Sequence, residues 1–217
     1  MKPLISFADE KIRPESPKKY AEKSLKCILY GEDKMNHTNK FSIRDIAIVG
    51  MAAAICAVSM IFKIPYGTGA MFHFGTAAIF TLAILFGGIR AGLAAAIGTA
   101  FYDLLMGFSP YTIWSFFIKG IAGLILGYIS HSAHTGGKSI IRNIIGCILS
   151  AIWTLIGYLV AWTFVIGKFE SALANAPSSI VNSVIGLIVA IPLAATLRIA
   201  LEKAGILGNS ASNINSN

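Results

Sequence analysis

Two ionisable residues lie in stretches that are otherwise apolar, and they are the clearest candidates for chemistry. Asp103 lies four residues before Gly107, and Lys119 lies nine residues after Pro110. Charged side chains inside apolar segments are costly, so they mark either ion pairs or functional sites. Two interpretations of this pair are open: a buried ion pair that only fixes two neighbouring helices, or a polar anchor in a ligand pocket.

Aromatic and amide residues are expected at the same depth as this pair. Trp and Tyr at a membrane interface often only anchor the protein at the lipid surface, whereas Asn182 needs a polar partner because its amide lies inside an apolar run. A small flat ring, stacked on aromatic side chains and held by a few polar groups, would suit such a set. The predicted substrate-binding residues are Lys119, Asp103, His73, Tyr102, Trp114, Trp162 and Asn182.

The chain carries few residues for catalysis or metal binding. After Asp45 the carboxylates are Asp103, Glu170 and Glu202, whereas an intramembrane aspartyl protease needs two within the membrane. The sequence contains neither an HExxH cluster nor a CxxC pair. His131 and His134 could hold a metal or lie in a solvated loop. We therefore predict no catalytic residues, no metal site and no cofactor.

The composition excludes most soluble proteins. Hydrophobic residues make up 55% of the 217 residues and charged residues 13%, with a mean hydropathy of +0.70, whereas soluble domains carry about 25% charged residues. The net charge of +8 is spread over an N-terminal tail and short loops rather than gathered in one patch. The predicted partner is therefore the lipid membrane and not nucleic acid.

Apolar runs predict an all-α integral membrane protein with six transmembrane helices. A helix needs roughly 20 apolar residues to span a bilayer, and its backbone must satisfy its own hydrogen bonds there. The runs lack the alternation typical of a membrane barrel. The expected helices are Ile46–Phe62, Met71–Phe86, Ala91–Met106, Pro110–Ser130, Ile140–Ile166 and Pro177–Leu201.

Loop charges predict the orientation. If the N-terminus is cytoplasmic, cytoplasmic segments carry eight Lys or Arg residues, and external segments carry only Lys63 and Lys168. The positive-inside rule then places both termini in the cytoplasm. We expect a polar basic cytoplasmic tail over residues 1–42, a membrane domain over residues 43–203 and a short polar C-terminal tail over residues 204–217.

Small residues lie on one face of the first helix. Gly50, Ala53, Ala54 and Ala57 are spaced at i, i+3, i+4 and i+7, and such faces let helices approach closely. This face could pack within the protein itself or dock another membrane subunit.

Four stretches together resemble a known family. They are His73–Phe80 (HFGTAAIF), Leu85–Arg90 (LFGGIR), Gly98–Leu105 (GTAFYDLL) and Phe116–Gly120 (FFIKG). They are similar to the substrate-binding S components of energy-coupling factor (ECF) vitamin transporters, closest to the group around riboflavin, pyridoxine and hydroxymethylpyrimidine uptake. The resemblance covers about residues 44–203.

The resemblance implies a multi-pass protein of a prokaryotic plasma membrane that captures a small vitamin or precursor from outside. It would dock on a transmembrane coupling subunit driven by two cytosolic ATPase subunits. Ala53 and Ala57 match the AxxxA docking motif of the family. Lys119 matches a family lysine, and Asn182 falls where the family often has Gln or Asn. Thr76 stands where the family often has an acidic residue.

Two other functions stay open. An independent secondary transporter or channel for a small solute would need ion-coupling carboxylates at a site in the middle of the membrane, and Asp103 is the one candidate. A membrane enzyme is disfavoured because no nucleophile or metal set is present in the sequence.

Overall fold

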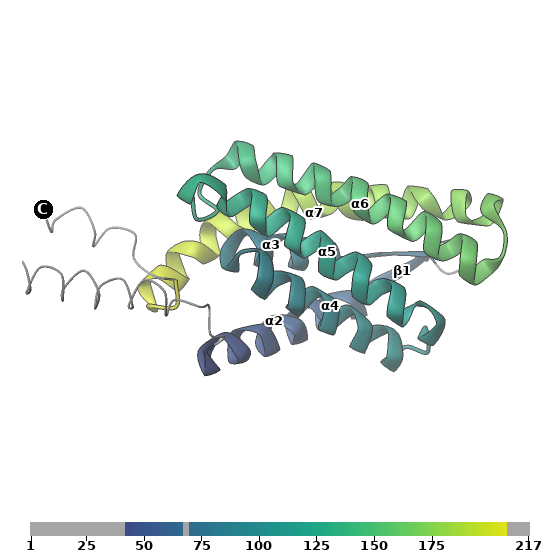
Figure 1. The fold of residues 1–217 in the computed structure, drawn as a ribbon, viewed down its shortest axis with the longest axis horizontal. Coiled ribbons are helices and arrows are strands. Elements are labelled where there is room, and N and C mark those ends of the chain that lie inside the picture. The colour runs from purple at the N-terminus through teal and green to yellow at the C-terminus, as the bar shows by residue number, and fades with distance from the viewer. Residues whose placement is uncertain (1–41, 67–69, 208–217) are drawn as a thin grey trace, which may run out of the picture. The chain divides into compact units, whose positions relative to one another are not determined.

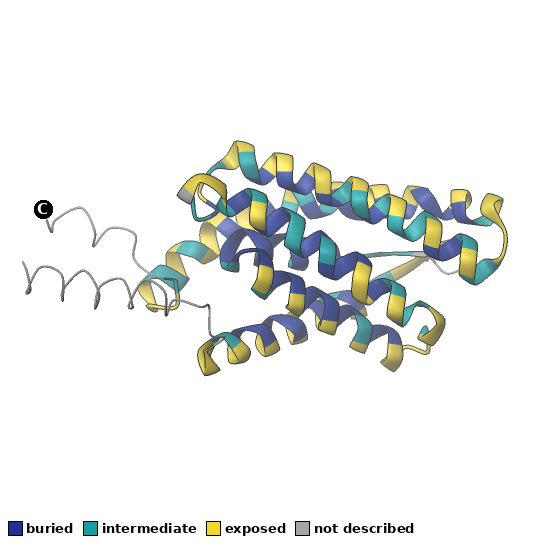
Figure 2. Cartoon of the chain, viewed as in Figure 1, coloured by how far each residue is buried: buried dark blue, intermediate teal, exposed yellow. Residues whose placement is uncertain are grey.

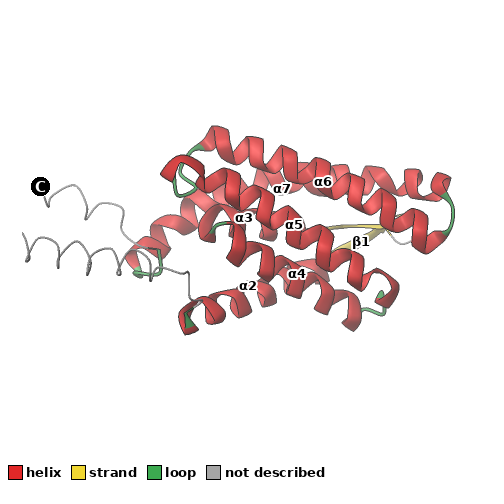
Figure 3. Cartoon of the chain, viewed as in Figure 1, coloured by secondary structure: helices red, strands yellow, loops and turns green. Residues whose placement is uncertain are grey.

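The structure is a computed structural model that describes residues 42–66 and 70–207, and its described part is a bundle of helices with one short hairpin (Figures 1 and 3). The helices and strands are α2 (Ile43–Ile61), β1 (Lys63–Tyr66), β2 (Ala70–His73), α3 (Gly75–Phe86), α4 (Gly88–Leu105), α5 (Thr112–His131), α6 (Ile140–Ile166) and α7 (Phe169–Lys203). Two 3-10 turns, Ser109–Tyr111 and Ser132–His134, flank α5. The predicted tail over residues 1–42 lies almost wholly outside the described residues, as does most of the tail over residues 204–217.

The expected helices agree with the structure except in two places. The helix expected over Met71–Phe86 is shorter, because Met71–His73 belongs to β2, which pairs antiparallel with β1. The strand is favoured there because both of its edges find hydrogen-bond partners, β1 on one side and a side chain of α7 on the other.

The last helix begins at Phe169 rather than Pro177 and contains both Pro177 and Pro192. Membrane helices tolerate such prolines because neighbouring groups satisfy the freed backbone atoms.

Among the residues that the structure describes, four helical segments are long and apolar enough to cross a membrane: Ile43–Ile61, Ser109–His131, Ile140–Ile166 and Phe169–Lys203. Helix α3 is apolar but has 12 residues, and α4 has 18. Large apolar side chains such as Ile141, Phe164 and Ile188 are exposed, while buried faces point into the bundle (Figure 2). This apolar exterior is what a lipid environment requires.

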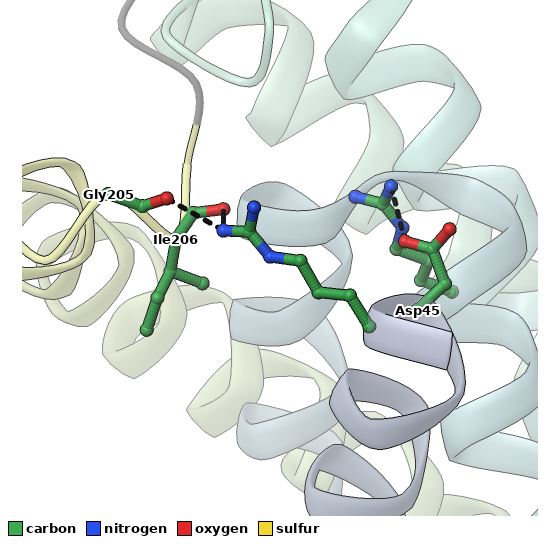
Figure 4. Close-up of polar contacts among 5 residues, drawn as sticks. Asp45, Gly205 and Ile206 are labelled. Atoms are coloured by element: carbon green, nitrogen blue, oxygen red, sulfur yellow. Dashed lines mark hydrogen bonds and ion pairs between the residues drawn. The ribbon is translucent and has the colours of Figure 1, made fainter. Parts of the chain in front are cut away.

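The helices run alternately between two ends of the bundle. We call the end that carries β1 and β2 the hairpin end; it also carries the turns at Gly107 and Gly167. We call the opposite end, which carries residues 132–139, the loop end (at the left of Figure 1). There Arg44 donates to the carbonyls of Gly205 (2.7 Å) and Ile206 (3.0 Å), and Arg90 pairs with Asp45 at 2.7 Å (Figure 4). The first and last described residues therefore lie at the same end.

Glycines bring the central helices close together. A Cβ on Gly98 in α4 would lie 2.4 Å from the carbonyl oxygen of Ala53 in α2. A Cβ on Gly127 in α5 would lie 2.3 Å from the backbone nitrogen of Gly88. Small residues at such crossings let two backbones touch, and this packing buries Ala53 against α4.

Candidate ligand-binding site

A cavity lies in the hairpin half of the bundle. Its volume is about 640 Å³, a figure that includes the open space at its mouth. Residues from α2, β2, α4, α5, α6 and α7 form its walls. Residues from most of the helices in the described bundle therefore line a single cavity.

Six of the seven predicted substrate-binding residues line this cavity: Lys119, Asp103, His73, Tyr102, Trp162 and Asn182. Trp114 does not line it. Its ring stacks on Phe164 of α6, with ring centroids 5.6 Å apart. Trp114 therefore links α5 to α6 instead of contributing to the cavity wall.

Asp103 and Lys119 share the cavity but form no salt bridge with each other. Lys119 is 5% exposed and Asp103 8% exposed. The Lys119 ammonium donates to Thr76 Oγ1 at 3.2 Å and lies 5.3 Å from the centroid of the Tyr158 ring. Asp103 Oδ2 is buried and has no hydrogen-bond partner among the described residues. The ion pair that is one interpretation of these two residues is thus absent from this structure.

The side chain of Asn182 is paired with the backbone of β2. Its Nδ2 donates to the carbonyl of Met71 at 2.8 Å, and its Oδ1 accepts from the backbone N–H of His73 at 3.0 Å. The amide thereby takes the place of a neighbouring strand. Asn182 positions the hairpin at the edge of the cavity, and this pairing uses the polar atoms that a ligand would otherwise contact.

His73 faces the cavity as a neutral ring. It lies in the hairpin that connects the first two helices, and its Nδ1 accepts a hydrogen bond from the Gly75 N–H at 3.1 Å. An accepting Nδ1 leaves the proton on Nε2. Burial lowers the pKa of His73 to about 3, and the positive charges of Lys119 and Lys63 act in the same direction. His73 therefore offers an N–H donor without a charge.

Tyr158 is a wall residue that the sequence reasoning missed. Its hydroxyl lies 3.2 Å from Ser115 Oγ, and its ring lies beside the Lys119 ammonium. A signal was present in the sequence, because Thr154, Tyr158 and Trp162 recur every four residues on one face of an apolar helix. Ser178 and Ser179 of α7 also line the cavity, and they lie four and three residues before Asn182.

Lys63 of the hairpin contacts two aromatic rings that line the cavity, those of Phe108 and Tyr102. Its ammonium lies 4.9 Å from the ring centroid of Phe108 and 5.4 Å from that of Tyr102. Such cation–π contacts are favourable by about 0.5–2 kcal/mol, depending on exposure. Lys63 therefore connects β1 to the end of α4 and to the turn that follows it.

The small-residue face of α2 borders a second, apolar groove. Ala53 and Ala57 line this groove together with Gly50 and Ala54, opposite Ile97 and neighbouring residues of α4. Ala53 is buried by its packing on Gly98, whereas Gly50 and Ala54 are exposed. The face thus serves internal packing on one side and leaves an open groove on the other.

One of the two histidines at the loop end, His131, contacts the backbone of its own helix. His131 Nδ1 lies 3.1 Å from the carbonyl oxygen of Gly127 one turn earlier in α5, and the side chain of His134 lies outside the described residues. Over residues 42–66 and 70–207, no three His, Cys, Asp or Glu side chains come close enough to hold a metal ion together.

Comparison with known proteins decides the family. The model of the ECF-type riboflavin transporter S component family matches residues 40–199. The chain belongs to this family. Two relatives of this S component are similar over more than half of its length. An uncharacterized protein in the gap 3' region of Pyrococcus woesei is 29% identical over 63% of this chain and 88% of its own length. A UPF0397 protein of an Exiguobacterium species is 30% identical over 56% of this chain and 68% of its own length.

Membership explains the architecture. An S component is the membrane-embedded, substrate-binding subunit of an ECF transporter, and it is a transporter subunit rather than an enzyme. The apolar helices agree with a multi-pass membrane protein. The resemblance carried by the four sequence stretches is confirmed for S components as a class.

Proposed function

We propose that this S component captures a small vitamin or vitamin precursor from outside the cell in the cavity at the hairpin end. The observation that carries the proposal is a set of polar groups, buried Asp103 and Lys119 and half-buried His73, gathered in one cavity inside a bundle with an apolar exterior. Tyr102, Tyr158 and Trp162 add ring surface to the same walls. This combination suits a flat ring with polar groups on its edge.

We further propose that all six helices span the membrane, with the loop end in the cytoplasm of a prokaryotic cell. The loop end carries Arg44, Arg90, Lys138, Arg142, Arg198 and Lys203, while the hairpin end carries Lys63 and Lys168. The positive-inside rule supports this orientation. The cavity then opens outward, as capture requires.

The groove beside α2 is the proposed contact with the transmembrane coupling subunit, which two cytosolic ATPases drive. Its apolar lining, its small residues Ala53 and Ala57, and its exposure between α2 and α4 support this role. A helix of the coupling subunit could approach closely where the side chains are this small.

Purification from the native membrane tests the proposed function. The tagged chain should bring down a transmembrane subunit and two ATPases, and mass spectrometry should find a small heterocyclic molecule in the preparation. The Lys119→Met variant is the matched control, since it should retain the same subunits and carry less of the molecule. Uptake by the chain alone in vesicles, driven by an ion gradient, would instead indicate an independent secondary carrier.

A further inference from the structure

Asp103 borders the cavity but keeps one carboxyl oxygen sealed inside the protein. The residue is 8% exposed and lines the cavity, yet its Oδ2 has no accessible surface and no hydrogen-bond partner among the described residues. A ligand in the cavity therefore cannot reach this atom. Because a buried charge is costly unless polar groups surround it, the carboxyl of Asp103 should act on its neighbours in the protein.

Ser115 links this carboxyl to the rest of the cavity wall. Its side chain is 3% exposed and lies close enough to the carboxyl of Asp103 to hydrogen-bond with it. Thr99, one turn before Asp103 in α4, donates to the backbone carbonyl of Ser115 at 3.3 Å and so holds this point of α5 against α4. The Ser115 hydroxyl also lies 3.2 Å from the hydroxyl of Tyr158 in α6. Three helices therefore meet in one chain of polar side chains: Asp103, Ser115 and Tyr158.

The carboxylate determines the direction of the hydrogen bonds in this polar chain. A carboxylate only accepts hydrogen bonds, so Ser115 donates its single O–H to Asp103. Since the Ser115 oxygen then has lone pairs but no proton to offer, Tyr158 donates its O–H to Ser115. The Tyr158 oxygen keeps lone pairs that can accept a hydrogen bond, and Tyr158 lines the cavity. A carboxylate that the ligand does not touch thereby makes Tyr158 an acceptor toward the cavity.

The ring of Tyr158 passes the same constraint to other residues of the wall. Its centroid lies 5.3 Å from the Lys119 ammonium and 5.4 Å from the ring centroid of Trp162. All three residues line the cavity. Fixing the Tyr158 hydroxyl therefore also fixes a ring surface beside the buried cation. In a buried site, hydrogen bonds in such a chain strengthen one another.

We propose that Asp103 is a positioning residue for ligand binding, which acts through Ser115 to hold Tyr158 in place and to turn the lone pairs of the Tyr158 oxygen toward the bound molecule. Asp103 itself makes no contact with that molecule. This inference rests on the proposed function and gives the buried carboxylate an indirect role in it.

Nuclear magnetic resonance of the purified full-length protein tests the polar chain without a ligand. Tyrosines carry an isotope label at Cζ, whose chemical shift responds to the hydrogen bonds of the hydroxyl, and the Tyr158 signal is the one lost in Tyr158→Phe. Asp103→Asn keeps the shape of the side chain and removes its charge, so it should shift this signal, as should Ser115→Ala. Glu170→Gln is the matched control, because Glu170 is an exposed carboxylate at the same end of the bundle; it should leave the signal in place.

Ligand binding tests the consequence. The probes are riboflavin, pyridoxine and 4-amino-5-hydroxymethyl-2-methylpyrimidine, followed by quenching of tryptophan fluorescence, and any heterocycle that accompanies the purified protein is added to them. Loss of a neutral hydrogen bond weakens binding roughly 2- to 10-fold, which is the effect expected for Asp103→Asn, Ser115→Ala and Tyr158→Phe on a probe that binds. In the Tyr158→Phe background, Asp103→Asn should have almost no further effect, because residues that act through one another are not additive.

Thr154→Val is the control for additivity. The Thr154 hydroxyl lines the cavity but donates to Ser150 within α6, so it lies outside the polar chain. Its effect on affinity should be the same with and without the Tyr158 hydroxyl.

The outcomes separate this inference from the proposed function. If Asp103→Asn weakens binding as strongly in Tyr158→Phe as in wild type, or leaves the Tyr158 signal unshifted, the positioning role is wrong while vitamin capture stands. A lower melting temperature with unchanged affinity would assign Asp103 a structural role alone. If none of the probes binds and no heterocycle accompanies the purified protein, capture is contradicted and the positioning role with it, while the Tyr158 signal still shows whether the polar chain exists.

Discussion

The side chain of Asn182 in α7 hydrogen-bonds the backbone of His73 in β2, with Oδ1 accepting from the His73 N–H at 3.0 Å. The same amide donates to the Met71 carbonyl at 2.8 Å. A residue 109 positions later in the chain thus completes the hairpin and determines where His73 meets the cavity.

Replacing Asn182 by Leu should loosen this hairpin. Two backbone groups of β2 lose their partners, and each unsatisfied group costs about 1–3 kcal/mol. Amide exchange at His73 should become faster, and the melting temperature should fall. Ser183→Ala is the matched control, because Ser183 Oγ donates only within its own helix, to Ser179. Equal effects of the two substitutions would contradict the role of Asn182.

Gly137 should tolerate no side chain, whereas Gly136 should tolerate one at a modest cost. Both have positive φ, +76° and +55°, so Ala at either position costs about 1–2 kcal/mol in backbone strain. A Cβ on Gly137 would also lie 2.1 Å from the Ile84 carbonyl oxygen, while a Cβ on Gly136 meets nothing within 4 Å. Melting curves should therefore show a clearly larger loss for Gly137→Ala. Similar losses would mean that the loop relaxes freely.

Arg198 joins three elements near Gly137 at the loop end. Arg198 of α7 donates to the carbonyls of Gly136 (2.6 Å) and Ile84 (3.1 Å). The clash in Gly137→Ala therefore pushes against both α3 and α7, which explains why its cost exceeds that of a strained loop alone.

The groove beside α2 should be sensitive to bulk. Ala54 is exposed and lines the groove, so Ala54→Trp should prevent association with the coupling subunit and leave ligand binding intact. Ala53→Trp is a poorer test, because Ala53 packs on Gly98 and its replacement also disturbs the bundle. Leu149→Trp, on an exposed position of α6, is the control and should still co-purify with the transporter. Loss of ligand binding in Ala54→Trp would point to internal packing instead.

Cysteine labelling should reveal the orientation. In a variant without the three native cysteines, Gly136→Cys at the loop end should react with an impermeant maleimide only from the cytoplasmic side. Glu170→Cys, at the exposed start of α7, should react only from outside. The opposite pattern would reverse the orientation derived from the loop charges.

Stability should fall with acid because of His73. Burial lowers its pKa from an ordinary value near 6.5 to about 3. Between these values the unfolded chain binds a proton that the folded protein does not, so the free energy of unfolding decreases as the pH drops below about 6.5, by up to about 1.4 kcal/mol per pH unit for one such group. Melting temperatures measured from pH 7.5 to pH 5 should decline less steeply for His73→Gln than for wild type. An unchanged decline would assign the effect to other groups.

The sequence alone determined the class of the protein and the rough position of its helices. Apolar runs near 20 residues long must be helical in lipid, because no other local structure satisfies the backbone there. The helix predicted over Ile140–Ile166 has the same bounds in the structure. Charges are rare in such runs, so the residue types and their positions are enough to single out Asp103 and Lys119.

Only the tertiary structure decided which residues meet. Met71–His73 is apolar enough for a helix, yet it forms a strand because Asn182, far along the chain, supplies the hydrogen bonds of a strand edge. Trp114 turns to Phe164 rather than to the cavity, and no spacing in the sequence reveals how α5 is rotated against its neighbours. Lys119 contacts Thr76 rather than Asp103, because the packing of separate helices, and not distance along one helix, determines which polar atoms lie within hydrogen-bonding reach.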